Sequence, residues 1–335
     1  MSLKAIAKAL GLSVTTVSRA LNGYSDVAQD TRQRVEQEAA RLGYRPNTLA
    51  RRLKMGKIDA IGLVFPFNTD SLSNSPLMEM IGCISHELGR NEIDLLLVAD
   101  NAPYQAFTRL IASKRVDALI VAHTLDNDPR LQELQRLDFP FLALGRSQLG
   151  KDYAWFDFDN HAGSLMAVNY LVSLGHQRIA YLGENNQQSF ISQRRQGYLD
   201  GLTHHKLPLR DDHLHSITPT RRAGYLATQA LLALAEPPTA IITDGNGHGE
   251  GAAMALRDAG KLGPHGVSLV VYDGLPPESL LDLPVAAIVQ ATRAEVGQQI
   301  AEMTLDLIRG EPLQKLQVLW QPVLKPNPED LPLHS

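Results

Sequence analysis

Cysteine and long apolar runs are both scarce in this sequence. Cys83 is the single cysteine among 335 residues, which excludes a disulfide framework and a zinc site made of several cysteines. No stretch approaches the roughly 18 consecutive apolar residues of a transmembrane helix, and Lys4 and Lys8 interrupt the N-terminal segment. Neither a membrane span nor a signal peptide is therefore expected. These absences predict a protein of the reducing cytoplasm with no membrane partner.

Motifs for catalysis and for cofactor binding are also missing. No glycine-rich dinucleotide fingerprint follows the first expected strand, where residues 65–69 read FPFNT. The glycine-rich segment 245–251 lacks the Lys-Ser/Thr pair of a phosphate-binding loop. The eleven histidines show no His-x-Glu-x-His or similar ligand spacing. We therefore expect no cofactor, no metal ion, no catalytic residues and no enzymatic activity.

A formal net charge of −4 hides an asymmetry along the chain. Residues 1–57 contain 11 Lys and Arg residues against four Asp and Glu residues, a net charge of +7, which leaves −11 on residues 58–335. A small basic segment followed by a large acidic body is typical of a polyanion-binding module joined to a second domain.

The basic segment carries the signals of three short helices, which are expected over residues 3–10, 14–21 and 31–42. Their expected N-caps are Ser2, Ser13 and Asp30. Ala7, Gly11 and Val17 have the spacing A-x3-G-x5-V, in which the small residue lets two helices approach and the glycine permits the turn. Two short helices joined by such a turn predict a helix-turn-helix unit.

The second helix of such a unit enters the major groove of DNA, and its first residues reach base edges. Val14 and Thr15 suit a thymine methyl group, whereas Arg19 suits a guanine or a phosphate. The DNA contacts predicted for this region are Ser13, Val14, Thr15, Thr16, Ser18, Arg19 and Asn22. The alternative is a three-helix protein-interaction bundle with a solvated basic face.

A short basic helix is expected after the third helix, over residues 48–54, with Asn47 as its cap. It is too short to be stable alone, so DNA or a second copy of the segment would have to stabilise it. Leu49 and Leu53 share one face beside basic residues, which suits an apolar wedge in the minor groove. The DNA contacts predicted here are Asn47, Ala50, Arg51, Leu53 and Lys54. The alternative is a flexible linker whose leucines pack on the body.

From Ile58 onward, short apolar runs alternate with longer amphipathic stretches. Strands are expected over residues 60–65, 94–99, 118–122, 140–144, 155–158, 178–182, 240–243, 268–272 and 286–289. This alternation predicts parallel sheets covered by helices on both faces, in two Rossmann-like α/β lobes. The first lobe is expected to span about 58–157 and 290–320, and the second about 158–289 and 321–335.

Two-lobed α/β proteins bind ligands at the carboxyl ends of their strands, in the cleft between the lobes. The effector contacts predicted there are Phe65, Phe67, Arg146, Trp155, Asp157, Asp159, Asn160, Arg194, Asn246, Asp273 and Gln290. Arginines, carboxylates and amides bind vicinal hydroxyls, and aromatic rings stack on sugar faces, so a carbohydrate is favoured. A purine or another metabolite remains an alternative. Three of these residues also have a structural alternative: Arg146 in a surface ion pair, Asp273 as a loop cap and Trp155 in the core.

The basic segment resembles the LacI/GalR family of bacterial transcription regulators. The resemblance rests on residues 6–22 (IAKALGLSVTTVSRALN), on Tyr44-Arg45-Pro46-Asn47 and on Ala50-Arg51-Arg52-Leu53. It implies that Leu53 is the hinge-helix leucine that opens the minor groove, and that Val14, Thr15 and Arg19 read bases. Ala5 departs from the family, which usually has an aspartate there.

The body resembles the periplasmic-binding-protein-like core of the same family. The motifs are Asp159-Asn160-x-x-Gly163, Leu174-Gly175-His176-x-Arg178-Ile179-Ala180 and Arg194-x-x-Gly197-Tyr198. By this resemblance Arg194 holds the effector, and Asn246 stands where the family usually has an aspartate.

The resulting expectation is a homodimeric regulator, in this family most often a repressor, that binds a pseudo-palindromic operator through residues 1–46. Residues 47–57 would form the hinge, and residues 58–335 would bind a sugar effector and dimerise. Sugar binding and operator binding would oppose each other through reciprocal coupling. The alternatives are a sugar receptor without DNA function and an enzyme that acts on a sugar or nucleotide.

Overall fold

The structure, a computed structural model, describes residues 2–21, 24, 26–44, 58–65, 75–99, 105–263, 266–281, 283 and 285–330. The chain forms two compact units, Met1–Asp59 and Ala60–Ser335. Within the described residues, no helix combines the length and the apolar character needed to cross a bilayer.

Three helices build the first unit: α1 (Leu3–Leu10), α2 (Val14–Leu21) and α3 (Gln29–Arg41). Gly11 ends α1 in the left-handed region, with φ of 65°, and its N–H donates to the carbonyl oxygen of Ala7. The small core that joins the helices consists of Ile6, Ala7, Val17, Ala20, Val35 and Ala39. The predicted turn and the predicted core role of Val17 are confirmed.

Of the three expected helix caps, only Ser13 makes a capping hydrogen bond. Ser13 Oγ accepts a hydrogen bond from the Thr16 N–H at 3.0 Å, which confirms the cap of α2. Ser2 lies at the N-cap of α1, but its side chain makes no capping bond. The predicted start of the third helix was wrong, because α3 begins at Gln29 after Ala28. Asp30 instead lies in the first turn, where its charge favours the positive end of the helix.

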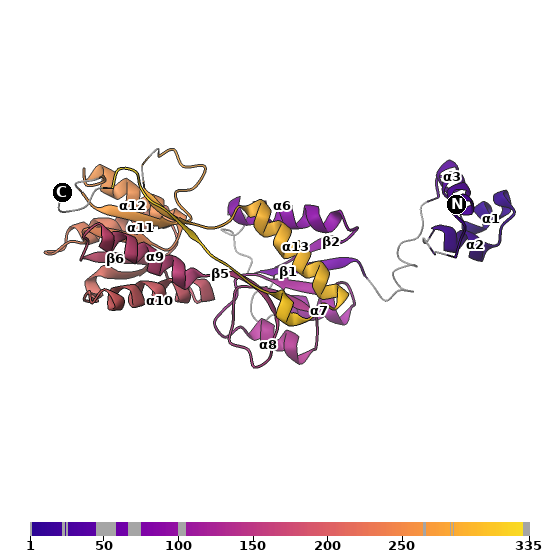
Figure 1. The fold of residues 1–335 in the computed structure, drawn as a ribbon, viewed down its shortest axis with the longest axis horizontal. Coiled ribbons are helices and arrows are strands. Elements are labelled where there is room, and N and C mark those ends of the chain that lie inside the picture. Colours follow the sequence, from indigo (N-terminus) through magenta and orange to yellow (C-terminus); the bar gives the residue numbers. More distant parts are fainter. Residues whose placement is uncertain are drawn as a thin grey trace. The chain divides into compact units, whose positions relative to one another are not determined.

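The first lobe of the second unit contains a parallel six-stranded sheet with the order β11-β5-β4-β3-β1-β2. Its strands are β1 (Ala60–Phe65), β2 (Asp94–Ala99), β3 (Ala118–Val121), β4 (Phe141–Leu144), β5 (Ala154–Phe158) and β11 (Gln317–Trp320). Helices α6 (Ser75–Gly89) and α13 (Arg293–Arg309) cover one face, and α7 (Gln105–Ala112) and α8 (Pro129–Arg136) cover the other (Figure 1). Alternation along β1 explains this: Ile61, Leu63 and Phe65 face α6 and α13, whereas Val64 faces α7 and α8.

The second lobe repeats the plan with the order β12-β10-β9-β8-β6-β7. Its strands are β6 (Ile179–Glu184), β7 (Leu214–Ile217), β8 (Ala240–Thr243), β9 (Ser268–Tyr272), β10 (Ala286–Val289) and β12 (Val323–Lys325). All are parallel except β12, which runs antiparallel to β10. Helices α9 (Asn160–Ser173) and α10 (Ser189–His204) cover one face, and α11 (Arg221–Leu232) and α12 (Asn246–Asp258) the other.

The chain passes between the lobes three times, after β5, after β10 and after β11 (Figure 1). The predicted two-lobed α/β architecture is confirmed. Three strands were not among those expected: β7, β11 and β12. All three are edge strands of their sheets and are only partly buried, unlike the fully buried central strands, so their sequences carry a weaker apolar signal.

Candidate functional site

The first turn of α2 presents the side chains predicted to meet DNA. Ser13, Val14 and Thr15 are exposed, while Val17 is buried in the helical core. Val14 is an apolar side chain with 41% of its surface exposed, available for contact with a thymine methyl group. Ser13 is held in place by the hydrogen bond of its Oγ to Thr16 Oγ1 at 2.8 Å.

Arg19 lies one helical turn further along the same surface. Its guanidinium pairs with the carboxylate of Asp26 and lies 5.0 Å from the ring centroid of Tyr24. Both members of the ion pair stay about half-exposed, so the arginine is oriented but accessible. Ser18 is half-buried on α2. The other predicted contacts Asn22, Asn47, Ala50, Arg51, Leu53 and Lys54 lie outside the described residues, as does the whole expected hinge helix.

A cavity of about 290 Å³ opens between the two lobes at the carboxyl ends of their strands. Of the eleven predicted effector residues, six line it: Asp157, Asn160, Arg194, Asn246, Asp273 and Gln290. Its apolar wall comes from residues such as Leu77, Met80, Phe190 and Ile300. The cavity therefore combines a polar floor with apolar sides, as sugar sites do.

Arg194 is the central cation of this cavity. Its side chain is 6% exposed and lies flat on Tyr272, with Cζ 3.5 Å from the ring centroid. Nε donates to Asn160 Oδ1 at 2.9 Å, and Nη1 donates to the backbone carbonyl of Asp244. Asp273 lies 4.0 Å from Nη2, and its backbone has φ of 65°. The guanidinium is thus fixed in one plane, with a carboxylate beside it.

A second arginine joins the lobes at the edge of the cavity. Arg146 Nε donates to Asp157 Oδ2 at 2.9 Å within the first lobe, and Nη2 donates to Gln193 Oε1 on α10 at 3.0 Å. Burial raises the pKa of the Asp157 carboxyl, although the bond from Arg146 opposes this shift. The ion pair foreseen for Arg146 as an alternative is present, and its partner lines the cavity.

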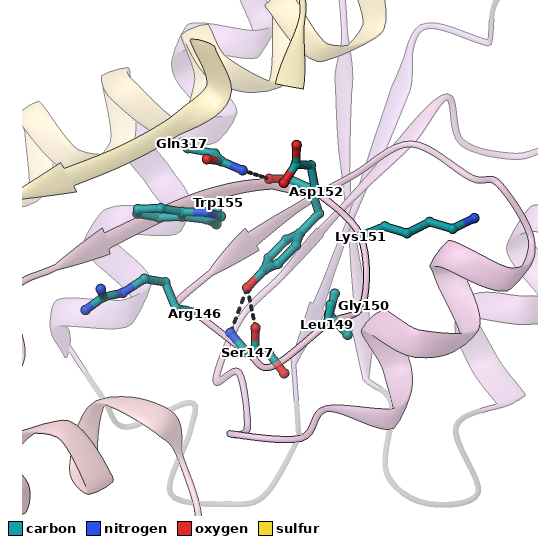
Figure 2. A pocket seen from close by; sticks show the side chains of 9 residues that line it. Arg146, Ser147, Leu149, Gly150, Lys151, Asp152, Trp155 and Gln317 are labelled. Atoms are coloured by element: carbon teal, nitrogen blue, oxygen red, sulfur yellow. Dashed lines mark hydrogen bonds between the residues drawn. The ribbon is translucent and has the colours of Figure 1, made fainter. Parts of the chain in front are cut away.

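Three predicted effector residues lie elsewhere. Phe65 has no exposed surface and belongs to the core of the first lobe, because it is the last inward-facing residue of β1. Asp159 Oδ1 caps α9 by accepting from the Ala162 N–H. Trp155 lies beside Arg146 in a separate, open hollow of about 640 Å³ near Lys151 and Gln317 (Figure 2). We correct these three predictions accordingly; Phe67 lies outside the described residues.

The cavity also contains residues that sequence reasoning missed, notably His123 and Glu184. Burial, followed by the charge of Arg130, lowers the pKa of His123 to about 4. Its φ of 54° turns the chain immediately after β3. Burial and the nearby Asp244 raise the pKa of Glu184. Glu184 ends the apolar strand β6 and His123 lies two residues after the apolar strand β3, and such positions at strand ends are the signal that could have found them.

Comparison with known proteins agrees with this architecture. The family described as "Bacterial regulatory proteins, lacI family" matches residues 2–47, and "Periplasmic binding proteins and sugar binding domain of LacI family" matches residues 58–321. The chain is 56% identical to the HTH-type transcriptional regulator RafR of Escherichia coli, over 98% of both chains. It is 35% identical to AglR of Rhizobium meliloti, over 96% of this chain and 92% of that one. The structure of the lac repressor dimer bound to operator and the anti-inducer ONPF superposes with a TM-score of 0.83, at 25% identity and 99% coverage of each chain.

Proposed function

Because this chain belongs to the LacI family of bacterial regulatory proteins, we propose that it represses a carbohydrate-utilisation operon and leaves its operator when a small sugar binds between the lobes. The chain is a DNA-binding transcriptional regulator with an N-terminal helix-turn-helix domain and a sugar-binding core.

In this proposal, residues 1–46 bind DNA, residues 47–57 form the hinge and residues 58–335 bind effector and dimerise. The division of the chain at Asp59 supports the boundary between the hinge and the core. So does the concentration of positive charge in residues 1–57, because phosphate contacts supply much of the affinity for DNA. The exposed residues at the start of α2 and the accessible Arg19 would read the operator.

The buried Arg194 is the observation that carries the sugar proposal. A guanidinium fixed by Tyr272 and Asn160, with Asp273 beside it, offers donors and an acceptor side by side. Adjacent sugar hydroxyls need such a paired arrangement, since each is both donor and acceptor. Asn246 and Gln290 add amide groups around it.

The proposed assembly is a homodimer on a pseudo-palindromic operator. Leu96 and Leu97 of β2 are 37% and 50% exposed, so this edge strand leaves one apolar side chain uncovered on each of its two faces. A second subunit would cover this edge strand. The relative solved as a dimer on its operator supports this arrangement, and two-fold symmetry of the protein implies two-fold symmetry of the site.

Sugar binding would tighten the contact between the lobes and change how the two heads are presented to DNA. The Arg146–Gln193 bond joins the lobes at the cavity, so a ligand beside Asp157 would act on both. Operator and sugar would then weaken each other's binding by the same factor. Because its partner is chromosomal DNA, we place the regulator in the cytoplasm, where it binds its sugar without converting it.

Fluorescence anisotropy with an operator selected from genomic fragments tests the proposal. Sugars are first chosen by the rise in melting temperature that they cause in the full chain. Every such sugar should weaken operator binding and should be recovered unchanged. Arg194→Lys should lose the response to sugar yet bind operator, whereas Arg195→Lys, a change at the exposed neighbouring arginine, should respond normally. Sugars that bind tightly but leave operator affinity unchanged would contradict the mechanism.

A further inference from the structure

Three potential metal ligands meet beside the cavity in the second lobe. Glu184 is the last residue of β6, Asp244 directly follows β8, and His248 lies in the first turn of α12. Strands β6 and β8 are parallel neighbours, so their carboxyl ends bring together residues 60 positions apart. One oxygen or nitrogen of each side chain lies within 4.8 Å of those of the other two.

The state of His248 sets this cluster apart from a solvated acidic patch. The imidazole has no exposed surface, and neither ring nitrogen has a hydrogen-bond partner of acceptable geometry among the described residues. Nε2 nevertheless lies 3.0 Å from Asp244 Oδ1, inside the cluster. A buried polar group without a hydrogen bond is costly and calls for an explanation. A cation that takes up Nε2 and both carboxylates would supply one.

We propose that Glu184, Asp244 and His248 form a binding site for a divalent transition-metal ion of the Zn²⁺ type. The two carboxylates balance the charge of the ion, and the imidazole selects it over Mg²⁺ and Ca²⁺, which prefer oxygen ligands alone. Three protein ligands would leave room for a further ligand on the ion, and Glu184 is the one of the three that also lines the cavity.

The surroundings hold the ligands in a suitable orientation. Tyr181 Oη donates to Asp244 Oδ2 at 3.0 Å, and the Glu184 N–H donates to the same carboxylate at 3.1 Å, so Oδ1 faces His248. Repulsion between Glu184 and Asp244 adds to burial in raising the pKa of Glu184, and a bound cation would relieve that repulsion. Arg194 is a positively charged neighbour of this cluster, and its Nη1 donates to the backbone carbonyl of Asp244.

The site also needs a small adjustment. Tetrahedral ligands about 2.0–2.2 Å from one ion lie about 3.3–3.6 Å apart. His248 Nε2 and Asp244 Oδ1, at 3.0 Å, are already that close, and the three ligand atoms lie within 4.8 Å of one another. Glu184 is the half-buried member of the cluster, so its carboxylate is the one that would move inward.

Metal binding by the untagged full chain, stripped with EDTA and dialysed, tests this site without DNA or sugar. Isothermal titration with ZnCl2 should give one site per chain, and CoCl2 should give the visible absorption bands of a low-coordinate Co²⁺ site. His248→Gln should weaken Zn²⁺ binding at least tenfold and abolish the bands. His161→Gln is the matched control, because His161 forms an exposed pair with Asp200 at 2.8 Å on the same lobe.

Substoichiometric Zn²⁺ binding by the parent chain would overturn the proposal, as would equal binding by His248→Gln. If that variant does not fold, Glu184→Gln takes its place, because its side chain is only half-buried. Zn²⁺ should raise the melting temperature of the parent chain and of the His161 variant but not of the Glu184 variant. Excess Mg²⁺ should leave the titration unchanged; competition by Mg²⁺ would contradict the role of the imidazole.

Discussion

The two lobes both bury carboxylates near the carboxyl ends of their strands, but they compensate these charges in different ways. In the first lobe, Asp128 lies 2.7 Å from Arg130, and Asp157 lies 2.9 Å from Arg146. In the second lobe, the carboxylate of Asp244 meets another acid and a histidine, while Arg194 binds the backbone carbonyl of Asp244 and not its carboxylate. The first lobe is thus a framework whose charges are satisfied internally. The second retains polar groups that a ligand or an ion would satisfy.

The histidines next to the cavity show the same contrast. His123 in the first lobe is near Arg130, and burial together with that charge keeps it neutral. His248 in the second lobe lies against the carboxylate of Asp244. A positively charged neighbour disfavours cation binding, and a negatively charged neighbour favours it. One partly buried and one fully buried histidine beside the cavity therefore differ in chemistry, because their charged neighbours differ.

Breaking the Asp128–Arg130 pair should cause the largest loss in the free energy of unfolding. Arg130→Met leaves the carboxylate of Asp128 buried without its cation, which costs about 3–5 kcal/mol in the free energy of unfolding. Urea denaturation of the full chain measures it. Arg136→Met removes an exposed arginine from the same helix and its pair with Glu133, and should cost below about 1 kcal/mol. Equal losses would show that the first lobe does not depend on its buried pair.

Arg194→Lys should cost less stability but about 100-fold in sugar affinity, roughly 2.7 kcal/mol. Lysine carries the charge but cannot offer two parallel N–H groups or lie flat on Tyr272. Isothermal titration with a sugar identified by thermal shift measures the loss. An affinity within threefold of the parent chain would mean that the cavity binds its ligand through other residues.

The sequence was most informative where one local pattern determines structure. The glycine turn and Val17 predicted the helix-turn-helix core, and continuous apolar runs predicted the central strands. Edge strands such as β7 and β11 were not predicted, because they are only partly buried and their sequences carry a weaker apolar signal. Phe65 was predicted at the cleft because it ends a strand there. Its side chain instead packs in the core, since alternation along β1 points it to the inner face.

The polar clusters were harder to predict because they join residues distant in sequence. A search for closely spaced histidine ligands could not reveal Glu184, Asp244 and His248, since β6 and β8 are brought together only by the sheet. The bond between Arg146 and Gln193 likewise spans two lobes. Asp159 shows the reverse problem, because a motif residue near the cleft serves as a helix cap.

The pH dependence of folding tests the contrast between the histidines. The pKa of His123 is about 4 in the folded chain and about 6.5 when unfolded, so the unfolded state binds the proton more readily. Its stabilising contribution is complete above pH 6.5 and is lost as the pH falls toward 4, by about 2 kcal/mol at pH 5. His123→Asn keeps a residue that tolerates the φ of 54° and removes this titration.

Urea denaturation at pH 7.5 and pH 5 measures the difference between the parent chain and this variant. Between pH 7.5 and pH 5 the free energy of unfolding should fall more in the parent chain than in the variant, because only the parent chain has the His123 titration. The same loss on acidification in both proteins would mean that other groups, and not His123, carry the pH dependence.

The smallest predicted effect concerns the bond that links the framework to the ligand-binding lobe. Gln193→Ala removes the acceptor for Arg146 Nη2, a hydrogen bond to a charged group across the lobes, and should weaken sugar binding three- to tenfold, about 1 kcal/mol. Gln196→Ala is the control, because Gln196 bonds to Asp200 within the same helix and is exposed. Isothermal titration with the same sugar compares them. Weaker sugar binding by Gln193→Ala alone would show that closure of the lobes depends on the bond from Arg146, which Asp157 holds in place, to Gln193. Equal affinities of the two variants would mean that the ligand alone holds the lobes together.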